Sequence, residues 1–234
     1  YAFTEQGWLQ FGDENEKYRV AQSIVERGDF SFRPTAYRNK IGVTGRTYSV
    51  YELGTSLTMA PFYALGKLAF TFFPTPDLNG IGMLFVGLMN PLLTALTGVL
   101  LFQTARQLGF RYRASLALAL TFGIATVAWP YSRQFTREPL MAFLILAAYY
   151  AFIRFAAASD RRWLIVGSVA TGYLAFTKFI QAAVIPFFIV YAVTVLYERA
   201  RASGMDLRAA RRTVTKIALG LALPTALFLL AQSL

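Results

Sequence analysis

The chain has 234 residues, of which 56% are hydrophobic and only 15% are charged. Soluble domains carry about 25% charged residues, so this composition excludes an ordinary soluble domain. There is no cysteine and no histidine, which excludes disulfides, thiolate metal sites and imidazole acid–base catalysis. The formal net charge is +11, and its meaning depends on where the basic residues lie.

Residues 1–54 have a mixed charge, with seven acidic and seven basic side chains, and predict a long folded loop rather than a membrane span. Within this loop, Glu14–Arg27 predicts a short helix. Asp13 stands at the N-cap position and Glu16 at the third helical position, which together would form a capping box. Gly28 follows the last helical residue, where glycine commonly ends a helix.

The end of the loop predicts a small β-hairpin followed by an apolar helix with two alternative placements. Lys40–Val43 and Thr47–Tyr51 flank the turn residues Thr44-Gly45-Arg46. Thr55–Phe73 is long enough to cross a membrane, but it contains a proline, a glycine and a lysine. If it crossed, the acidic loop would be cytoplasmic. We favour an amphipathic helix in the membrane interface, which leaves the loop on the outer face.

The remainder of the chain consists of long apolar runs separated by short charged segments. A helix of about 20 residues crosses a ~30 Å hydrocarbon core, and roughly 17–25 residues is the working range. Shorter runs reach this length when the residues at their ends snorkel, so the pattern predicts about six transmembrane helices. The uncharged runs are Ile81–Ala105, Ala114–Ser132, Pro139–Ile153, Trp163–Thr177, Phe179–Tyr197 and Ile217–Leu234.

Basic residues gather at the ends of these runs. This alternation is the positive-inside pattern of membrane proteins, and it argues against a nucleic-acid partner as the cause of the net charge. It places the arginine clusters in the cytoplasm, and Thr75–Gly80, Tyr131–Glu138 and Lys178 on the outer face. The clusters are Arg106, Arg111 and Arg113; Arg154, Arg161 and Arg162; and Arg199, Arg201, Arg208, Arg211, Arg212 and Lys216.

Ionisable residues of the outer face are the candidates for chemistry. Lys178 interrupts an apolar stretch, and an ionisable residue at such a depth is costly, which makes it a functional candidate. A carboxylate can take the proton of an acceptor hydroxyl, while lysine or arginine can stabilise the charge of a departing phosphate. The candidate carboxylates are Asp13, Glu14 and Glu138, and the candidate cations are Lys178, Arg133 and Arg137.

Each candidate also has a purely structural explanation. Asp13 suits a helix cap, and Glu14 suits the solvated face of the same helix. Glu138 precedes a proline, where a carboxylate favours a helix N-terminus. Lys178 can snorkel to the interface from a helix end, and the two arginines before Glu138 can anchor the chain at the interface.

Several short motifs are shared with a known family. They are Gly12-Asp13-Glu14, Tyr18, Ala21, Ser23, Gly28-Asp29, Gly45-Arg46, Tyr48-Ser49, Gly54-Thr55-Ser56, Ala60-Pro61, Tyr63, Tyr131-Ser132, Glu138 and Thr177-Lys178 ahead of Pro186. Together they resemble the C-type (GT-C) membrane glycosyltransferases, in particular members similar to protein O-mannosyltransferases and to lipopolysaccharide-core transferases of rhizobia. The chain departs from this pattern at Glu52 and Arg137, where relatives more often have small, apolar or proline residues.

The resemblance implies a multispanning enzyme that transfers a sugar from a polyprenyl-phosphate donor, with inversion at the anomeric carbon. The acceptor, a lipid, a glycan or a protein, would be bound on the extracytoplasmic face. Asp13 is implied as the base, Glu14 as its support or alternate, and Glu138 as a second acidic residue from the next outer loop. The implied ligands of the donor phosphate are Lys178, Arg133 and Arg137.

The expected fold is an all-α polytopic transmembrane helix bundle, residues 81–234, below a long extracytoplasmic first loop, residues 1–80, of short helices and a small hairpin. Both ends look cut, because the first residue is tyrosine and the last apolar run reaches the final residue. We expect a bacterial or archaeal plasma membrane, with membrane lipids as partners and the active site facing outside. No cofactor is expected to be required, since an acidic pair without further ligands makes a weak site for a divalent metal.

Two other classes of function are open at this stage. A transporter or flippase of lipid-linked sugars predicts ionisable residues midway through the helices, together with repeated halves and broken helices. A non-catalytic membrane scaffold predicts that Asp13, Glu138 and Lys178 do not converge. The ionisable residues of this chain lie at the ends of its apolar runs, which favours chemistry at the membrane surface.

Overall fold

The structure is a computed structural model that describes residues 12–32, 39–41, 45–73, 78–158, 160–202 and 226. The described residues are mostly helical, as the sequence predicts. They divide into two compact units. The first unit takes Tyr1–Leu96 and Thr121–Leu140, and the second takes Thr97–Leu120 and Met141–Leu234.

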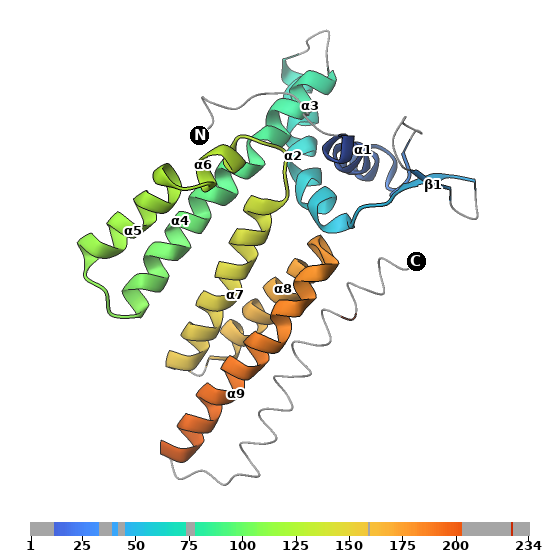
Figure 1. Ribbon diagram of the computed structural model, residues 1–234. Coiled ribbons are helices and arrows are strands. Elements are labelled where there is room, and N and C mark those ends of the chain that lie inside the picture. Colours follow the sequence, from blue (N-terminus) through green and yellow to red (C-terminus); the bar gives the residue numbers. More distant parts are fainter. Residues whose placement is uncertain are drawn as a thin grey trace. The chain divides into compact units, whose positions relative to one another are not determined.

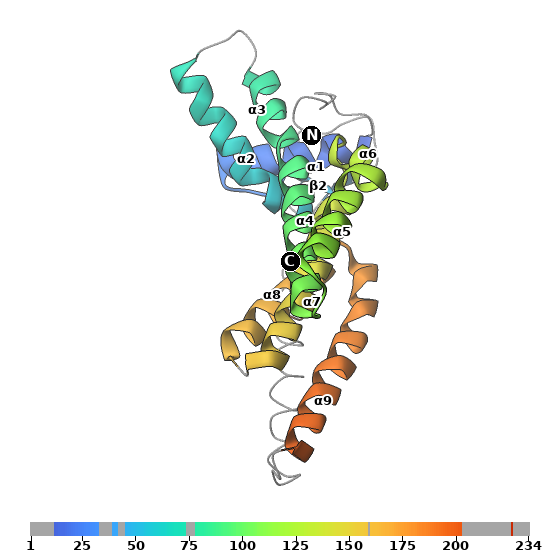
Figure 2. The same ribbon diagram turned by 90° about the vertical axis from the view of Figure 1, so that its left-hand side faces the viewer.

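The first unit is built around three helices and a hairpin. Its elements are α1 (Gly12–Arg27), β1 (Asn39–Ile41), β2 (Thr47–Ser49), α2 (Leu53–Phe72), α3 (Leu78–Gly87), the start of α4 (Met89–Gln107) and α6 (Ala128–Ser132). Helix α1 packs against α2 (Figure 1), and α2 lies beside α3 (Figure 2). Strand β2 also contacts α1, so the hairpin is attached to the same helix group.

Helix α1 confirms the predicted short helix but not the predicted cap. It begins at Gly12, so Asp13 lies inside the first turn, where a carboxylate is stabilised by the helix dipole. Glu16 accepts a hydrogen bond of 3.0 Å from the Ser49 hydroxyl, so it faces the hairpin instead of closing a capping box. Gly28 ends the helix with a φ of 70°, a conformation that glycine adopts without strain.

The predicted hairpin is present, although its strands are shorter than expected. Strands β1 and β2 pair antiparallel, with Lys40 opposite Tyr48 and Ile41 opposite Thr47. Gly45, with a φ of 74°, lies in the connection between them. Residues 42–44 of the predicted turn lie outside the described residues.

Aromatic and glycine residues form the contact between the three helices. The ring of Tyr18 in α1 meets the ring of Tyr63 in α2 edge to face, with centroids 5.7 Å apart, and both side chains are buried. Gly82 of α3 lies under these rings, because a Cβ atom there would stand 2.6 Å from the Tyr18 hydroxyl. Gly66 of α2 faces Gly82 backbone to backbone. Small residues at such a crossing let two helices approach closely.

The segment Thr55–Phe73 forms one continuous helix within α2, with Pro61 inside it. One side of α2 is buried against α1 and α3, whereas Leu65, Leu68 and Phe72 are exposed on the other side. The exposed apolar side is compatible with contact to lipid, whether the helix lies in the interface or crosses the membrane. The interfacial placement itself stays a prediction.

Two helical segments in the described part of the chain are long and apolar enough to cross a membrane. They are Asn79–Gln107 with 29 residues and Glu138–Ala158 with 21 residues. They correspond to the predicted spans Ile81–Ala105 and Pro139–Ile153. The predicted span Ile217–Leu234 lies outside the described residues apart from residue 226. The number of spans beyond these two stays a prediction.

The predicted span Ala114–Ser132 is not one continuous helix. Helix α5 is Tyr112–Ala125, and α6 begins at Ala128. Thr126 explains the break, because its hydroxyl donates to the Phe122 carbonyl at 2.6 Å and accepts from the Ala128 backbone N–H at 3.1 Å. At 1.5 Å per residue, the 14 residues of α5 extend only about 21 Å.

The second unit is held by aromatic contacts between its helices. It contains most of α7 (Glu138–Ala158), together with α8 (Arg161–Thr177), the 3-10 helix η2 (Phe179–Val184) and α9 (Ile185–Ala202). The ring of Tyr150 meets Trp163 edge to face at 5.6 Å, and the centroids of Phe152 and Phe188 are 5.3 Å apart. Gly167 gives Phe152 its space, since a Cβ atom there would lie 2.9 Å from the ring.

Replacing Gly82 with alanine tests the close packing of α3 against the two tyrosines. The added methyl group would overlap the rings of Tyr18 and Tyr63, and overpacking of this kind costs about 1–3 kcal/mol. We expect a lower melting temperature for Gly82→Ala in thermal unfolding of the purified full chain in detergent.

The matched control is Gly98→Ala, a helical glycine whose added Cβ would meet only the Ala119 carbonyl oxygen at 3.9 Å. Alanine is favoured over glycine in a helix by roughly 0.5–1 kcal/mol, so this variant should melt no lower than the wild type. Equal melting temperatures for the two variants would contradict the close approach of the helices in the first unit.

Candidate active site

A buried lysine holds the carboxylate of Asp13. Asp13 and Lys17 stand one turn apart on α1, and the Lys17 ammonium donates to Asp13 Oδ2 at 3.0 Å. The Lys17 side chain is only 2% exposed, whereas that of Asp13 is 34% exposed. The ammonium also lies 5.1 Å from the centroid of the Tyr51 ring, and aromatic faces attract cations. Asp13 is therefore reachable from solvent, while its partner is not.

The pKa of Asp13 is lowered from its usual value. Partial burial by itself raises it, but the hydrogen bond and the charge of Lys17 outweigh that effect, and the charge of Arg137 adds to them. Opposite charges nearby favour the ionised form of a carboxyl group. Asp13 is consequently a carboxylate at neutral pH, with cations from two separate parts of the first unit near it.

Arg137 is held in place by Glu52. Its Nη1 donates to Glu52 Oε2 at 2.9 Å, and both side chains are mostly buried, with 18% and 26% exposed. Glu52 immediately precedes α2, and Arg137 immediately precedes α7. The two positions at which the chain departs from the resembled pattern therefore form an ion pair with each other.

The loop between α6 and α7 is attached to α4 by a buried amide. Asn90 is 2% exposed, and its Nδ2 donates to the carbonyl oxygens of Gln134 and of Thr136, the latter at 2.8 Å. A buried side chain that satisfies two loop carbonyls restricts the loop strongly. This loop carries Arg133 and Arg137, so Asn90 helps to set where their backbone lies.

Glu14 and Glu16 are both buried, with 1% of each residue exposed. The solvated helix face considered for Glu14 from the sequence is therefore wrong, because the side chain points into the first unit. The pKa of Glu16 is raised, mainly by burial, even though Ser49 donates a hydrogen bond to it. The start of α1 thus combines one accessible carboxylate, Asp13, with two buried ones, Glu14 and Glu16.

The chain matches a known protein family. The sequence model of the dolichyl-phosphate-mannose-protein mannosyltransferases matches residues 70–234, which is more than two thirds of the chain. The chain belongs to this family. No curated protein and no solved structure gave a significant match.

Members of the mannosyltransferase family are glycosyltransferases of the GT-C type and integral membrane proteins. The resemblance identified in the sequence is confirmed at this level. The two apolar helical segments are compatible with it. The matched region includes Arg133, Arg137, Glu138 and Lys178 but begins after α1, so Asp13 lies outside it.

The structure of this mannosyltransferase family member brings together some of the predicted site residues. Arg137 is near enough to Asp13 to lower its pKa, and Glu138 follows Arg137 as the first residue of α7. Arg133 directly follows α6, and its side chain is half-buried. Their roles in catalysis stay predictions.

Lys178 belongs to the second unit. It is the extended residue between α8 and η2, with φ −156° and ψ 114°, and its backbone N–H donates to the Leu174 carbonyl at 3.1 Å. Its side chain is half-buried. Helix α8 ends at Thr177, as the predicted run Trp163–Thr177 implies, and the next run begins as the 3-10 helix η2. A part for Lys178 in phosphate binding stays a prediction.

Three residues of the site were missed from the sequence. Lys17 was detectable, because it follows Asp13 at the i, i+4 spacing that brings opposite charges together on a helix. Glu52 was noted only as a departure from the family pattern. Asn90 gave no signal beyond being an amide in an apolar run. Among the described residues, no three carboxylates gather in a way that would hold a metal ion.

A double-mutant cycle on Glu52 and Arg137 tests whether the pair holds the loop before α7. Because both side chains are mostly buried, we expect Glu52→Gln and Arg137→Gln each to lower stability and the pair to show a coupling energy of about 1 kcal/mol. Thermal unfolding of the full chain measures this. Fully additive effects would contradict the ion pair, whereas recovery in the charge-swapped variant Glu52→Arg with Arg137→Glu would support it.

Proposed function

We propose that the chain transfers a mannosyl residue from a polyprenyl-phosphate donor to an acceptor hydroxyl on the extracytoplasmic face, with inversion at the anomeric carbon. The observation that carries this proposal is the accessible carboxylate of Asp13, which is kept ionised by Lys17 and Arg137. Membership of the mannosyltransferase family supplies the reaction class and the kind of donor.

In the proposed reaction, Asp13 accepts the proton of the acceptor hydroxyl. The hydroxyl oxygen attacks the anomeric carbon from the side opposite the phosphate and forms the new glycosidic bond. The bond between that carbon and the phosphate oxygen breaks, and its electron pair leaves with the polyprenyl phosphate. A single displacement of this kind inverts the anomeric configuration. A general base contributes typically 10²–10⁴-fold to such a step.

A lowered pKa makes Asp13 a weak base, so its role is to be ionised and in position before the hydroxyl loses its proton. Proton transfer then accompanies the formation of the new bond, when the hydroxyl becomes acidic. Lys17 is too buried to meet a substrate, and we propose that it acts by stabilising the carboxylate of Asp13. We propose that Glu14, which is buried on α1, supports Asp13. Glu138 is proposed as the alternate base.

The departing phosphate gains negative charge, and the cations proposed to stabilise it are Lys178, Arg133 and Arg137. Arginine binds phosphate oxygens through two parallel N–H groups. Arg137 uses one of its nitrogens for Glu52, and it would approach the phosphate with the others. Because positive side chains are proposed for this role, we propose that no metal ion is required; the alternative is a divalent ion at the acidic pair Asp13 and Glu14.

The proposed cellular setting follows from the charge pattern and the family. We propose a bacterial or archaeal plasma membrane, as the resemblance found in the sequence implies. We propose that the site faces outside, because the arginine clusters favour the cytoplasmic side. The family description names a protein as the acceptor, and lipid and glycan acceptors are the alternatives.

Changing Asp13 to asparagine tests the base. The amide keeps the size of the carboxylate but cannot take the proton, so transfer should fall by about 10²–10⁴-fold. The measurement is transfer from radiolabelled polyprenyl-phosphate mannose by the full-length protein in membranes.

The matched control is Asp160→Asn, at an exposed helix cap whose side chain accepts from the Arg162 backbone N–H. Asparagine is an equally good cap, so this variant should transfer like the wild type. Unchanged transfer by a folded Asp13→Asn protein would move the base to Glu14 or Glu138.

Changing Lys17 to methionine tests the electrostatic support of Asp13. The variant loses the main group that lowers the pKa of Asp13, so that pKa should rise. Transfer requires the ionised form, and the acidic limb of the profile of kcat/KM against pH should therefore shift to higher pH. The exposed lysine of α2 provides the control, Lys67→Met, which should leave the profile unchanged. If the acidic limb of the Lys17→Met profile does not shift, then the ionisation of Asp13 does not control the rate, and Asp13 is not the base.

A further inference from the structure

The short segment between the hairpin and α2 contacts the charged groups around Asp13. Ser49 is the last residue of β2, and α2 begins at Leu53, so residues 49–52 connect the two elements. Three side chains of this segment each meet a different charged side chain. Two of those charged side chains are the cations that lower the pKa of Asp13.

Ser49 attaches the segment to α1. Its hydroxyl donates to Glu16 Oε2 at 3.0 Å and accepts from the Tyr51 backbone N–H at 3.1 Å. Glu16 also accepts a hydrogen bond from the Val50 backbone N–H. Because Glu16 is only 1% exposed, these bonds form a buried attachment. They therefore determine where the backbone of Tyr51 lies relative to α1.

The ring of Tyr51 lies over the ammonium group of Lys17, with 5.1 Å between Nζ and the ring centroid. The same ammonium donates to Asp13 Oδ2 at 3.0 Å, so both the ring and the carboxylate attract it. The attraction between an ammonium and an aromatic face is stronger when the pair is removed from water, and the Lys17 side chain is 2% exposed. A long lysine side chain loses much rotamer freedom when it is ordered. The ring therefore helps to offset the cost of keeping Lys17 beside Asp13.

The same segment positions the second cation. Glu52 accepts a hydrogen bond from Arg137 Nη1 at 2.9 Å, and the charge of Arg137 lowers the pKa of Asp13. Since Tyr51 and Glu52 are adjacent, one stretch of backbone carries the contacts of both cations. The charge of Asp13 interacts with those of Glu16 and Lys17 on α1 and of Arg137 from the loop before α7.

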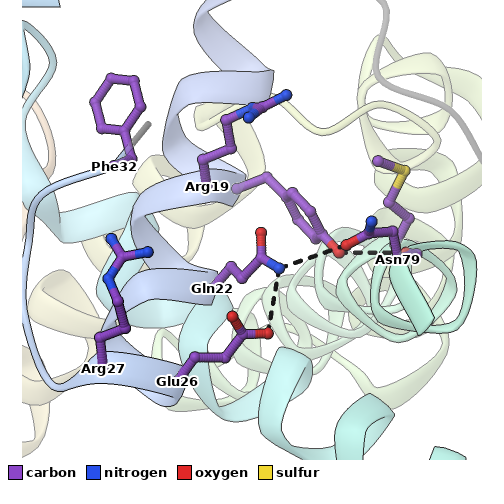
Figure 3. Close-up of a pocket in the computed structure, with 8 residues that line it drawn as sticks. Arg19, Gln22, Glu26, Arg27, Phe32 and Asn79 are labelled. Atoms are coloured by element: carbon purple, nitrogen blue, oxygen red, sulfur yellow. Dashed lines mark hydrogen bonds between the residues drawn. The ribbon is translucent and has the colours of Figure 1, made fainter. Parts of the chain in front are cut away.

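The second half of α1 is anchored separately, against α3. A polar cavity of about 400 Å³ lies along this half and is also lined by Asn79 and Met83 (Figure 3). Within it, Gln22 Nε2 donates to Asn79 Oδ1 at 3.4 Å and to Glu26 Oε1 at 3.2 Å, so that Gln22 joins the two side chains. These bonds hold the helix without involving residues 49–52. The contacts of the segment therefore act on the charged first half of α1.

We propose that Tyr51 is a positioning residue for the transfer reaction, because its ring keeps the Lys17 ammonium on the Asp13 carboxylate while Ser49 and Glu16 keep the ring in place. Tyr51 acts through Lys17 rather than on the substrate. This inference rests on the proposed function, in which Asp13 is the base. Loss of the ring lets Lys17 leave Asp13, and the carboxylate then loses a charge that favours its ionised form.

Changing Tyr51 to leucine tests this role by two measurements on the full-length protein. The first is the pKa of Asp13, followed by NMR of protein labelled at its aspartate carboxyl carbons, with Asp13→Asn to assign the signal. The second is the acidic limb of kcat/KM against pH for transfer from polyprenyl-phosphate mannose. Both should move to higher pH by roughly half a pH unit, in the direction expected for Lys17→Met and by less. An unchanged pKa of Asp13 in a folded Tyr51→Leu protein would overturn the proposal.

A double variant tests whether Tyr51 acts through Lys17. In the Lys17→Met background, Tyr51→Leu should cause no further change in the pKa of Asp13, because the group that the ring holds is already absent. Such non-additivity is the mark of two residues that act together. An equal shift with and without Lys17 would overturn the proposal.

The matched control is Gln22→Ala, which loosens α1 from α3 and leaves residues 49–52 unchanged. It should leave the pKa of Asp13 and the acidic limb at their wild-type positions. A shift as large as that of Tyr51→Leu would overturn the proposal, because any loosening of α1 would then have the same effect.

The two measurements also separate this inference from the proposed function. If the pKa of Asp13 rises in Tyr51→Leu and the acidic limb follows it, both are supported. If the pKa rises and the limb stays in place, Tyr51 positions Lys17 as inferred, and Asp13 is overturned as the base.

A second set of variants covers the case in which Tyr51→Leu does not fold. Phenylalanine at position 51 keeps the ring and should restore the wild-type pKa of Asp13. Increasingly fluorinated phenylalanines keep the shape of the ring but weaken the negative charge of its face, so the pKa of Asp13 should rise along the series. A constant pKa along the series would overturn the role of the ring.

Discussion

The contact of Tyr18 and Tyr63 above Gly82 determines where α1 lies in the first unit. Two buried aromatic rings, one from α1 and one from α2, meet edge to face over a glycine of α3. The hydroxyl of Tyr18 also donates to the Asn79 carbonyl at 3.2 Å, so polar and apolar contacts fix the same helix. Because α1 carries Asp13, the proposed transfer centre depends on this packing arrangement.

Burial of Lys17 is the second constraint on the site. An ammonium group that is 2% exposed is costly unless it is paired, and here it has a carboxylate and an aromatic ring within reach. The arrangement places the desolvated member of the pair inside and leaves Asp13 accessible. The pairing with Asp13 offsets part of the cost of burying the ammonium group, and the same pairing stabilises the ionised form of Asp13. The reverse arrangement would leave Asp13 unable to meet an acceptor.

The sequence alone predicted those elements whose formation depends on a few neighbouring residues. Helix α1, its end at Gly28 and the hairpin were predicted because glycines and strand patterns act over a few residues, although the predicted cap of α1 was wrong. The break at Thr126 was missed, since a threonine inside an apolar run gives no warning that its hydroxyl will take the N–H of Ala128. Long-range partners such as Glu52 with Arg137, 85 residues apart, cannot be read from spacing. The resemblance to the family supplied candidate residues, and the structure shows that one of them, Arg137, lies near enough to Asp13 to lower its pKa.

The Glu52–Arg137 pair also changes how departures from a family pattern should be interpreted. Taken singly, each of these charges looked like a local disturbance of substrate contacts. As a pair they form a mostly buried ion pair, and removing one partner leaves an uncompensated charge. The two substitutions are therefore one structural feature, which joins the segment before α2 to the loop before α7. Because Arg137 also acts on Asp13, this feature supports the acidic turn of α1 through electrostatics, although neither residue lies near Asp13 in the sequence.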